Sequence, residues 1–273
     1  MSRLAELAAA VGADPASLPD PGPVVLDVVA DSRQVAPGAL FCCVSGERHD
    51  GHDHAGAAVG AGAVALLCER RLAVDVPQIV VPDVRAVMGP AAALVHGDPS
   101  ASLDVVGVTG TNGKTTVVSM IASILAVAGR RARTIGTLTG ARTTPEAPDL
   151  QRELAGFVAD GIDSVAIEVS SHALSMHRVD AVHFAVAVFT NLGTDHLDFH
   201  GTPEAYFAAK ARLFEAGRAR LGVVNTDDVR GRLLVDAAEI PMVPVSMSAA
   251  TEVRTGRDGM HLVWRGIALH VPM

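Results

Sequence analysis

The residues best suited to chemistry lie in a glycine-rich segment, Gly110 to Thr116, with the sequence Gly-Thr-Asn-Gly-Lys-Thr-Thr. The apolar run Val105-Val106-Gly107-Val108 precedes it and a long helical pattern follows. Glycines let a backbone approach an anion closely, and the next helix directs its first N–H groups at that anion. The segment therefore predicts a phosphate-binding loop, in which Lys114 reaches the outer phosphates and the Thr115 hydroxyl contacts Mg²⁺.

The loop is a variant, because Val108 occupies the position of the first glycine in the strict Gly-x₄-Gly-Lys-[Ser/Thr] pattern. A glycine-rich turn that binds no ligand is the alternative explanation of the same residues. The strand pattern before the loop and the helix pattern after it favour phosphate binding.

A single carboxylate, Glu168, interrupts the apolar stretch Val165 to Val169. Burying an unpaired carboxylate is unfavourable, and a metal ion removes that cost. One hypothesis is a Mg²⁺ ligand beside the phosphate loop. The other is a strand-end carboxylate that caps the next helix.

Two further segments carry polar groups after strand patterns. Asn191 to Gly201 contains two Asp and two His, of which Asp195 and His196 are candidates for binding a metal or a phosphate. A solvated loop is the alternative, and the absence of His-Glu-x-x-His or paired cysteines argues against zinc. Thr143-Thr144-Pro145 and Arg178 are candidates for binding an anionic group, with helix capping and a surface charge as the alternatives.

Lys210 has unusual neighbours for a lysine. On the helix predicted from Pro203 it shares a face with four aromatic or apolar residues, which are Tyr206, Phe207, Leu213 and Phe214. The simpler explanation is a buried stem with the amine in water. The functional alternative is a lysine of lowered pKa that reacts as a neutral amine.

Composition places limits on the class of protein. The chain has 273 residues, 49% of them hydrophobic and only 3% aromatic, which suits parallel sheets flanked by alanine-rich helices. The net charge is −8 and there is no long run of Lys or Arg, so nucleic-acid binding is not expected. Three cysteines without a metal-ligand pattern suggest a reducing cytoplasm, and the apolar residues 55–68 are too few to span a membrane.

The pattern of elements predicts an α/β protein with two domains. Residues 1–98 form a small α/β domain, with strands over 24–29, 40–44, 64–67 and 78–81 and helices over 54–62 and 83–94. In residues 99–273, strands alternate with helices. The predicted strands cover 105–108, 165–169, 184–190 and 221–225. One predicted helix has an apolar face over 117–128, and another covers 203–217. Such alternation predicts a doubly wound, mostly parallel sheet with ligands beyond the carboxyl ends of its strands.

Together these segments resemble the Mur ligase family of peptidoglycan synthesis, in the branch that adds the third amino acid to UDP-N-acetylmuramoyl-L-alanyl-D-glutamate. Besides the glycine-rich loop, the resemblance rests on motifs whose order and spacing are specific. They are Asp31-Ser32-Arg33, Pro37-Gly38, Leu40-Phe41, Thr143 to Pro148, Glu168 to Leu174, Asn191 to Gly201 and Ala209 to Phe214.

The resemblance implies an ATP-dependent ligase in which ATP phosphorylates a carboxylate and an amine attacks the acyl phosphate. ATP and Mg²⁺ are the implied cofactors. Lys114, Lys210 and His196 are the implied catalytic residues, with Thr115 and Glu168 on one Mg²⁺ and a carbamylated Lys210 with His196 on a second. The implied nucleotide contacts are Gly110, Thr111, Asn112, Gly113, Lys114, Thr115, Thr116 and Asn191.

The implied partners are UDP-N-acetylmuramoyl-dipeptide and an amino acid. Thr143, Thr144, Ser170 and Arg178 match residues that hold the muramoyl-peptide, and Ser32, Glu47, Arg48 and His49 match the UDP-binding part. Whether the third amino acid is meso-diaminopimelate or lysine stays open.

Members of the family are longer, so we expect the central domain to be incomplete at its C-terminus, with the ligase C-terminal domain absent from this chain or supplied separately. Two alternatives follow. One is an inactive homologue that binds a nucleotide or UDP-sugar, and the other is a folylpolyglutamate synthetase-like ligase.

Overall fold

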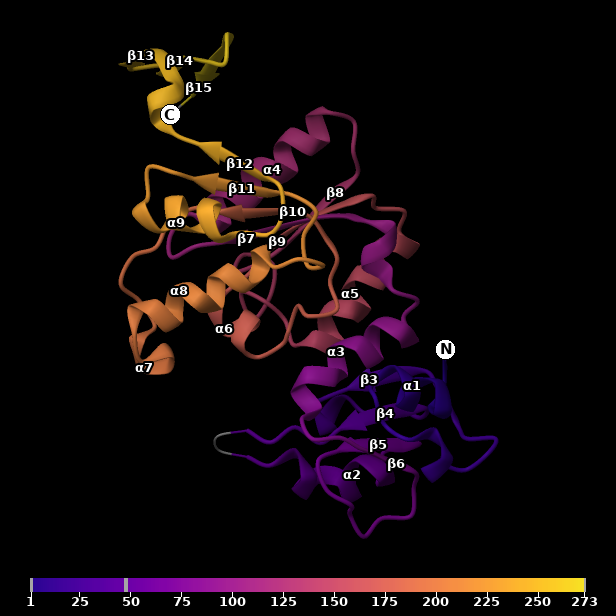
Figure 1. Cartoon of the computed structure of the whole chain (residues 1–273). Coiled ribbons are helices and arrows are strands. Elements are labelled where there is room, and N and C mark those ends of the chain that lie inside the picture. Colours follow the sequence, from indigo (N-terminus) through magenta and orange to yellow (C-terminus); the bar gives the residue numbers. More distant parts are fainter. Residues whose placement is uncertain (1, 47–48, 273) are drawn as a thin grey trace.

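The N-terminal part of the protein is built on a four-stranded parallel sheet of order β3-β4-β5-β6 (Figure 1). The computed structural model describes residues 2–46 and 49–272. Every residue of β4 and β5 is buried, so apolar groups must cover both faces of this sheet. Helices α1 and α3 cover one face and α2 the other. The elements are β3 (Asp27–Val29), β4 (Ala39–Cys42), β5 (Ala65–Cys68), β6 (Gln78–Val80), α1 (Leu4–Ala10), α2 (Ala55–Gly60) and α3 (Val84–Val95).

The single strand predicted over 24–29 is wrong, because the structure divides it. β2 (Val24–Val25) pairs antiparallel with β1 (Ser2–Arg3), whereas β3 pairs in parallel with β4. The two halves thus have different partners, and the half-exposed Leu26 lies between them. The helix predicted over 54–62 is shorter than expected, since a 3₁₀ turn, Gly51–His54, precedes α2.

The second part contains a six-stranded sheet of order β12-β11-β10-β7-β9-β8, in which every pairing is parallel. This confirms the predicted α/β architecture with a mostly parallel sheet. Two of its strands, β8 and β12, were not predicted. The strands are β7 (Asp104–Thr109), β8 (Ala132–Ile135), β9 (Ser164–Glu168), β10 (Phe184–Phe189), β11 (Gly222–Asn225) and β12 (Met242–Val245).

One face of this sheet carries the large apolar core. Leu150, Leu154, Leu174, Leu213 and Leu234, from the helical segments, pack with strand residues in a single cluster. Helices α8 and α9 (Figure 1) pack against this core. The helices are α5 (Ala147–Ala159), α6 (Ser171–Ser175), α7 (Leu197–His200), α8 (Pro203–Ala211) and α9 (Val229–Ala237). The helix predicted over 203–217 ends sooner, since α8 gives way to a 3₁₀ turn at Arg212–Phe214.

The opposite face of the sheet carries α4 (Lys114–Val127). The predicted apolar face of this helix is only partly in contact with the sheet. Val118 is buried, but Met120 is 52% exposed and Ile124 is 67% exposed. The helix is apolar around most of its circumference, and the sheet can bury only one side of it.

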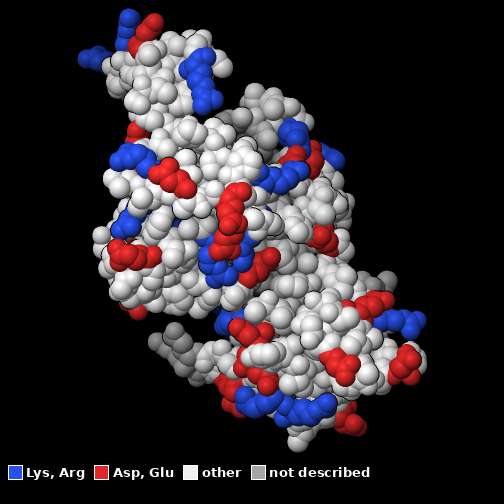
Figure 2. Space-filling view, viewed as in Figure 1, with Lys and Arg blue, Asp and Glu red and all other residues white. Residues whose placement is uncertain are grey.

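A three-stranded antiparallel sheet ends the described chain and was not predicted. It consists of β13 (Ala250–Gly256), β14 (Gly259–Trp264) and β15 (Ile267–Val271). Figure 2 shows acidic and basic side chains interspersed over the visible face, without an extended patch of one sign. Among residues 2–46 and 49–272, no helix is long and apolar enough to cross a membrane.

Candidate phosphate-binding and metal site

The loop between β7 and α4 has the backbone conformation that its glycines permit. Gly110 has φ +146° and Gly113 has φ +83°, both in regions that disfavour a side chain. A Cβ atom on Gly110 would also overlap the Thr190 hydroxyl. Glycine at position 110 is therefore required by both backbone and packing.

Residues at the end of β10 hold this loop in place. Asn112 N donates to Asn191 Oδ1 (3.0 Å), and Asn191 Nδ2 donates back to Asn112 O (3.2 Å). Thr190 Oγ1 also donates to Asn112 O (2.7 Å). The predicted nucleotide contact Asn191 thus uses its carboxamide to fix the loop.

Both lysines of the sequence, Lys114 and Lys210, meet at one atom of the loop. Each Nζ donates to the carbonyl of Gly110 at 2.9 Å, and Lys114 Nζ also donates to Thr111 O (2.9 Å). Lys210 is 1% exposed and its amine lies 4.5 Å from the centroid of the Tyr206 ring. Two amines from distant parts of the chain therefore form one positive centre at the loop.

Burial changes the protonation of both amines. It lowers the pKa of Lys114, against the opposing effects of Glu168 and Asp195. Burial, together with the charge of Lys114, lowers the pKa of Lys210 to about 7. An appreciable fraction of Lys210 is then a neutral, nucleophilic amine at neutral pH.

This lowered pKa predicts a pH dependence of stability. An unfolded lysine binds its proton below pH 10.5, whereas folded Lys210 binds it only below about 7. Between those values the unfolded state holds more protons, so the free energy of unfolding should rise with pH, by at most about 1.4 kcal/mol per pH unit. We expect this rise to be absent from Lys210→Met, in urea denaturation at pH 7 and pH 9 in carbon dioxide-free buffer. Parallel pH curves for the two proteins would contradict the lowered pKa.

Thr115 and Glu168 form a pair of oxygen ligands beside the loop. Thr115 Oγ1 donates to Glu168 Oε2 (3.0 Å), and Thr137 N donates to Glu168 Oε1 (2.9 Å). The carboxylate is 1% exposed at the end of β9. A buried carboxylate with an adjacent hydroxyl is a donor set that Mg²⁺ prefers, so these residues fit the implied metal.

The carboxylate of Glu168 lies where a side chain at position 136 would be. Gly136 has no Cβ, and a Cβ at this position would overlap Glu168 Oε1. We expect Gly136→Ala to displace the carboxylate, to lower stability by about 1–3 kcal/mol, and to weaken ATP binding only when Mg²⁺ is present. Calorimetry with and without Mg²⁺ measures this. Gly140→Ala is the matched control, because its Cβ would make only an ordinary contact, 3.4 Å from Arg142 O. Equal effects of the two substitutions would remove Glu168 from metal binding.

His196 lies on the Tyr206 side of the loop. The centroid of its ring lies 4.7 Å from the ring centroid of His172 and 6.1 Å from that of Tyr206. Its Nε2 lies 3.5 Å from Asp195 Oδ2. Tyr206 OH is 3.1 Å from Thr111 Oγ1. Tyr206 thereby links the loop to the lysine and histidine, a role that its position four residues before Lys210 could have indicated.

The predicted muramoyl-peptide residues lie beside Glu168. Thr144 is fully buried, and its hydroxyl donates to Glu168 O (2.8 Å), so it orients the strand end. Thr143 Oγ1 is 3.1 Å from Thr137 Oγ1. Ser170 Oγ accepts from Ala173 N (3.1 Å) and caps α6.

Arg178 belongs to a cluster of three guanidinium groups around the carboxylate of Glu146. The distances to the carboxylate oxygens are 2.8 Å for Arg178, 3.5 Å for Arg85 and 3.5 Å for Arg142. Buried Arg178 Nε and Arg85 Nη1 have no hydrogen-bond partner among the described residues. One carboxylate cannot balance three cations, so the cluster is suited to a further anion.

This cluster borders a cavity of about 770 Å³ between the two parts of the chain. Its lining includes Ser32, Arg33, His49, Arg85, Arg142 and Glu146. The predicted UDP contacts Ser32 and His49 therefore share one cavity with Arg85 and Arg142. Glu47 and Arg48, the other two, lie outside the described residues.

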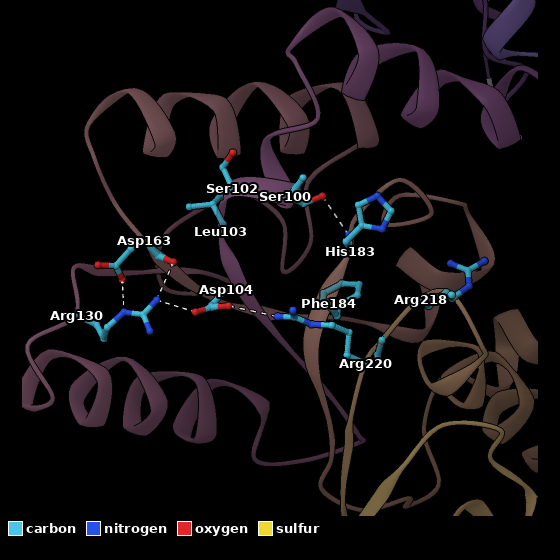
Figure 3. Close-up of a pocket in the computed structure, with 13 residues that line it drawn as sticks. Ser100, Ser102, Leu103, Asp104, Arg130, Asp163, His183, Phe184, Arg218 and Arg220 are labelled. Atoms are coloured by element: carbon cyan, nitrogen blue, oxygen red, sulfur yellow. Dashed lines mark hydrogen bonds and ion pairs between the residues drawn. The ribbon is translucent and has the colours of Figure 1, made fainter.

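A second cavity, of about 630 Å³, lies at the opposite edge of the six-stranded sheet (Figure 3). Its lining includes Asp104 at the start of β7 and Phe184 at the start of β10. Its charges pair with one another, as Arg130 does with Asp104 (2.7 Å) and with Asp163 (2.9 Å). The cavity contains no residue of the glycine-rich loop, and ligands of such sheets bind at the other edge.

The fold and the loop define a class of protein: a doubly wound α/β protein with a glycine-rich loop between strand and helix at the carboxyl ends of its strands. The chain belongs to the Mur ligase family. The model of the Mur ligase middle domain matches residues 108–270, and that of the Mur ligase family catalytic domain matches residues 27–96. The resemblance noted in the sequence is thereby confirmed.

Curated relatives point to the same branch. The UDP-N-acetylmuramoyl-L-alanyl-D-glutamate–2,6-diaminopimelate ligase of Streptomyces coelicolor is 44% identical over 257 residues, which cover 89% of this chain and 50% of that protein. The ligase of the same name from Geobacillus thermodenitrificans is 43% identical over 246 residues, covering 83% of this chain and 50% of that protein. The chain thus spans about half the length of the curated relatives it matches.

Solved structures agree. A structure of a UDP-N-acetylmuramoyl-L-alanyl-D-glutamate–2,6-diaminopimelate ligase superposes with a TM-score of 0.80 at 30% identity, covering 91% of this chain and 56% of that one. A Mycobacterium tuberculosis folylpolyglutamate synthase, solved with ADP and AMPPCP, reaches 0.52 at 16% identity over 64% of this chain and 50% of that one. That second likeness concerns the fold alone, so the folylpolyglutamate alternative gains no support from it.

Proposed function

We propose that this chain supplies the UDP-sugar-binding and ATP-binding parts of a cytoplasmic ligase that adds an amino acid to UDP-N-acetylmuramoyl-L-alanyl-D-glutamate. Residues 1–98 would be the first part and residues 99–273 the second. One observation carries the proposal: the lysine pair on Gly110 O and the Thr115–Glu168 pair lie at one edge of the sheet. The names of the relatives favour 2,6-diaminopimelate as the added amino acid.

The roles of the residues follow from their positions. Bound Mg²⁺-ATP would supply the phosphoryl group that converts the substrate carboxylate into an acyl phosphate. The amine of Lys114 and the N–H groups of residues 110–116 would stabilise the charge that builds up on the transferring group. Thr115 and Glu168 would hold the metal, and Tyr206 and Asn191 would keep the loop in position.

Lys210 is suited to carbamylation, because its neutral amine can attack carbon dioxide. A C–N bond forms, the product is a carbamate anion, and one proton leaves to solvent. The modification replaces a buried cation beside Lys114 with an anion, which pairs with Lys114 and offers oxygen ligands near His196. This removes the repulsion between the two ammonium groups.

The three arginines and the cavity of about 770 Å³ suit the anionic half of the substrate. UDP-N-acetylmuramoyl-L-alanyl-D-glutamate carries a diphosphate and carboxylates, which planar guanidinium groups bind through paired hydrogen bonds. Ser32 and His49 would contact the uridine end, and Arg178 would contact the peptide end.

Two titrations and one assay test the function. Calorimetry of the chain with UDP-N-acetylmuramoyl-L-alanyl-D-glutamate, and separately with Mg²⁺-ATP, should show binding of both. Arg178→Lys should weaken only the first. Phosphate release that requires the UDP-dipeptide, Mg²⁺ and an amino acid would establish the ligase chemistry, and a chain that binds neither ligand would refute the proposal.

A nucleotide- and UDP-sugar-binding module is the second candidate. The lysine pair on Gly110 O and the cavity of about 770 Å³ are binding features, and they are what favours this candidate. Binding of both ligands without any phosphate release would select it.

A further inference from the structure

The three-stranded sheet β13-β14-β15 at the end of the described chain (Figure 1) carries three side chains that can bind a metal ion. They are Asp258, in the turn between β13 and β14, His261 of β14 and His270 of β15. A carboxylate oxygen and one ring nitrogen of each histidine lie within 4.8 Å of one another. Among residues 2–46 and 49–272, no other group of three histidine, cysteine or acidic side chains comes this close together.

The register of the strands brings these groups together. His261 and His270 are directly opposite each other in the antiparallel pair β14–β15, so their side chains share one face. The rings are stacked, with centroids 4.2 Å apart and an angle of 8° between their planes. His261 Nε2 lies 3.0 Å from Asp258 Oδ2, and His270 Nε2 donates to Asp258 O (3.0 Å). Strand pairing therefore holds both imidazoles beside the carboxylate.

Gly259 allows the turn to approach β15 closely. Its φ is +132°, in a region that disfavours a side chain. A Cβ at this position would overlap Val271 O and would lie 3.0 Å from His270 Nε2. The contact between the turn and His270 therefore depends on glycine at position 259.

The donor set indicates which cation would bind. Two imidazole nitrogens and one carboxylate oxygen are a ligand set of zinc sites that keep a fourth position for water. Zinc–ligand bonds of about 2.0–2.2 Å place the ligand atoms about 3–4 Å apart, and these exposed side chains can close the remaining gap by rotation. Ca²⁺ and Mg²⁺ prefer a shell of oxygens, which three side chains with only one carboxylate do not provide.

The sheet itself has little apolar burial. In the described structure no residue of β13 or β15 is buried, and only Gly259 and Leu262 of β14 are. Three strands need an apolar face or another cross-link to be stable. A metal ion bound to the turn, to β14 and to β15 supplies such a link.

We propose that Asp258, His261 and His270 form a zinc site that links the strands of the β13–β15 sheet. The two histidines bind as neutral imidazoles and Asp258 binds as a carboxylate, so binding strengthens as the imidazoles lose their protons. Arg254, opposite His261 on β13, is the nearby cation that the ion must tolerate. The inference is independent of the proposed function, because none of these residues belongs to the glycine-rich loop or to the arginine cluster.

Calorimetry of the metal-free chain with ZnCl₂ tests binding. We expect one Zn²⁺ per chain whose affinity falls at least 10-fold in His270→Gln and in Asp258→Asn, each of which removes one ligand. His183→Gln is the matched control, because His183 is an exposed histidine 3.5 Å from the carboxylate of Asp98, without a third ligand. Its zinc affinity should equal that of the unchanged protein, and Mg²⁺ at the same concentration should not compete.

Hydrogen exchange locates the bound ion. At a free Zn²⁺ concentration ten times the dissociation constant, amides of β14 and β15 should exchange about 10-fold more slowly, because the ion must leave before these strands separate. Amides of β3 to β6 should be unaffected, and His270→Gln should lose the protection. Trp264, the single tryptophan of the sequence, belongs to β14, so its fluorescence checks that the sheet remains folded in each variant.

Three results would overturn the inference. They are a chain that binds no Zn²⁺, a zinc affinity that His270→Gln and Asp258→Asn both leave unchanged, and zinc binding that does not protect β14 and β15. The titrations with Mg²⁺-ATP and the UDP-dipeptide are carried out without zinc, so their outcome neither supports nor contradicts this site.

Discussion

Replacing Lys114 with alanine should weaken the binding of Mg²⁺-ATP about 10- to 150-fold. This range corresponds to the loss of a hydrogen bond to a charged group, worth about 1.5–3 kcal/mol. The amine already lies over the loop, 2.9 Å from Gly110 O and 2.9 Å from Thr111 O, so it needs little rearrangement to contact a phosphate. Calorimetry with Mg²⁺-ATP measures the change.

Arg220→Ala is the control for this experiment. Arg220 lines the cavity at the opposite edge of the sheet and its side chain is exposed, so the substitution removes one positive charge far from the loop. The ATP affinity of the Arg220→Ala variant should match that of the unchanged protein. If Lys114→Ala also binds ATP with unchanged affinity, Lys114 does not contact the phosphates of bound ATP.

Lys210→Ala should abolish the carbamate and reduce substrate-dependent phosphate release about 10²- to 10³-fold. A fall in rate of this size is typical when one electrostatic contact is removed from a transition state. Because Lys114 and Lys210 are the only lysines of the sequence, a carbamate formed from ¹³C-labelled bicarbonate has few sites to occupy. Carbon NMR should show the carbamate in the unchanged protein and lose it in this variant.

Rescue distinguishes a carboxylate-like role from a structural one. Formate or acetate can occupy the space left by the side chain and supply the missing anion, so either should restore part of the activity of Lys210→Ala. Methylamine should not. Rescue by the amine, or persistence of the carbamate signal in the variant, contradicts carbamylation of Lys210.

Local sequence was sufficient to predict the glycine-rich loop between a strand and a helix and the type of sheet. Glycines before a lysine and a threonine specify the loop because its backbone needs positive φ at Gly110 and Gly113. Alternation of apolar runs with helical patterns specifies a parallel sheet. Strands β8 and β12 escaped prediction because they are short edge strands with partly exposed residues.

Sequence reasoning was weaker where the partner of a side chain lies far along the chain. Nothing near Glu146 indicates that Arg85, from the N-terminal part, approaches it. Nothing near Gly136 indicates that a carboxylate needs the space. The helical spacing over 117–128 predicts an apolar face, yet it cannot tell which of its residues contact the sheet.

By itself, the sequence determined the class of fold, the family and the types of residue that could do chemistry, because these depend on periodicity and on short motifs. The tertiary structure alone decided that Lys210 shares Gly110 O with Lys114, although 96 positions separate the two lysines, because a parallel sheet gathers the ends of distant strands at one edge. It also decided that Lys210 is buried, and burial is what lowers its pKa to about 7.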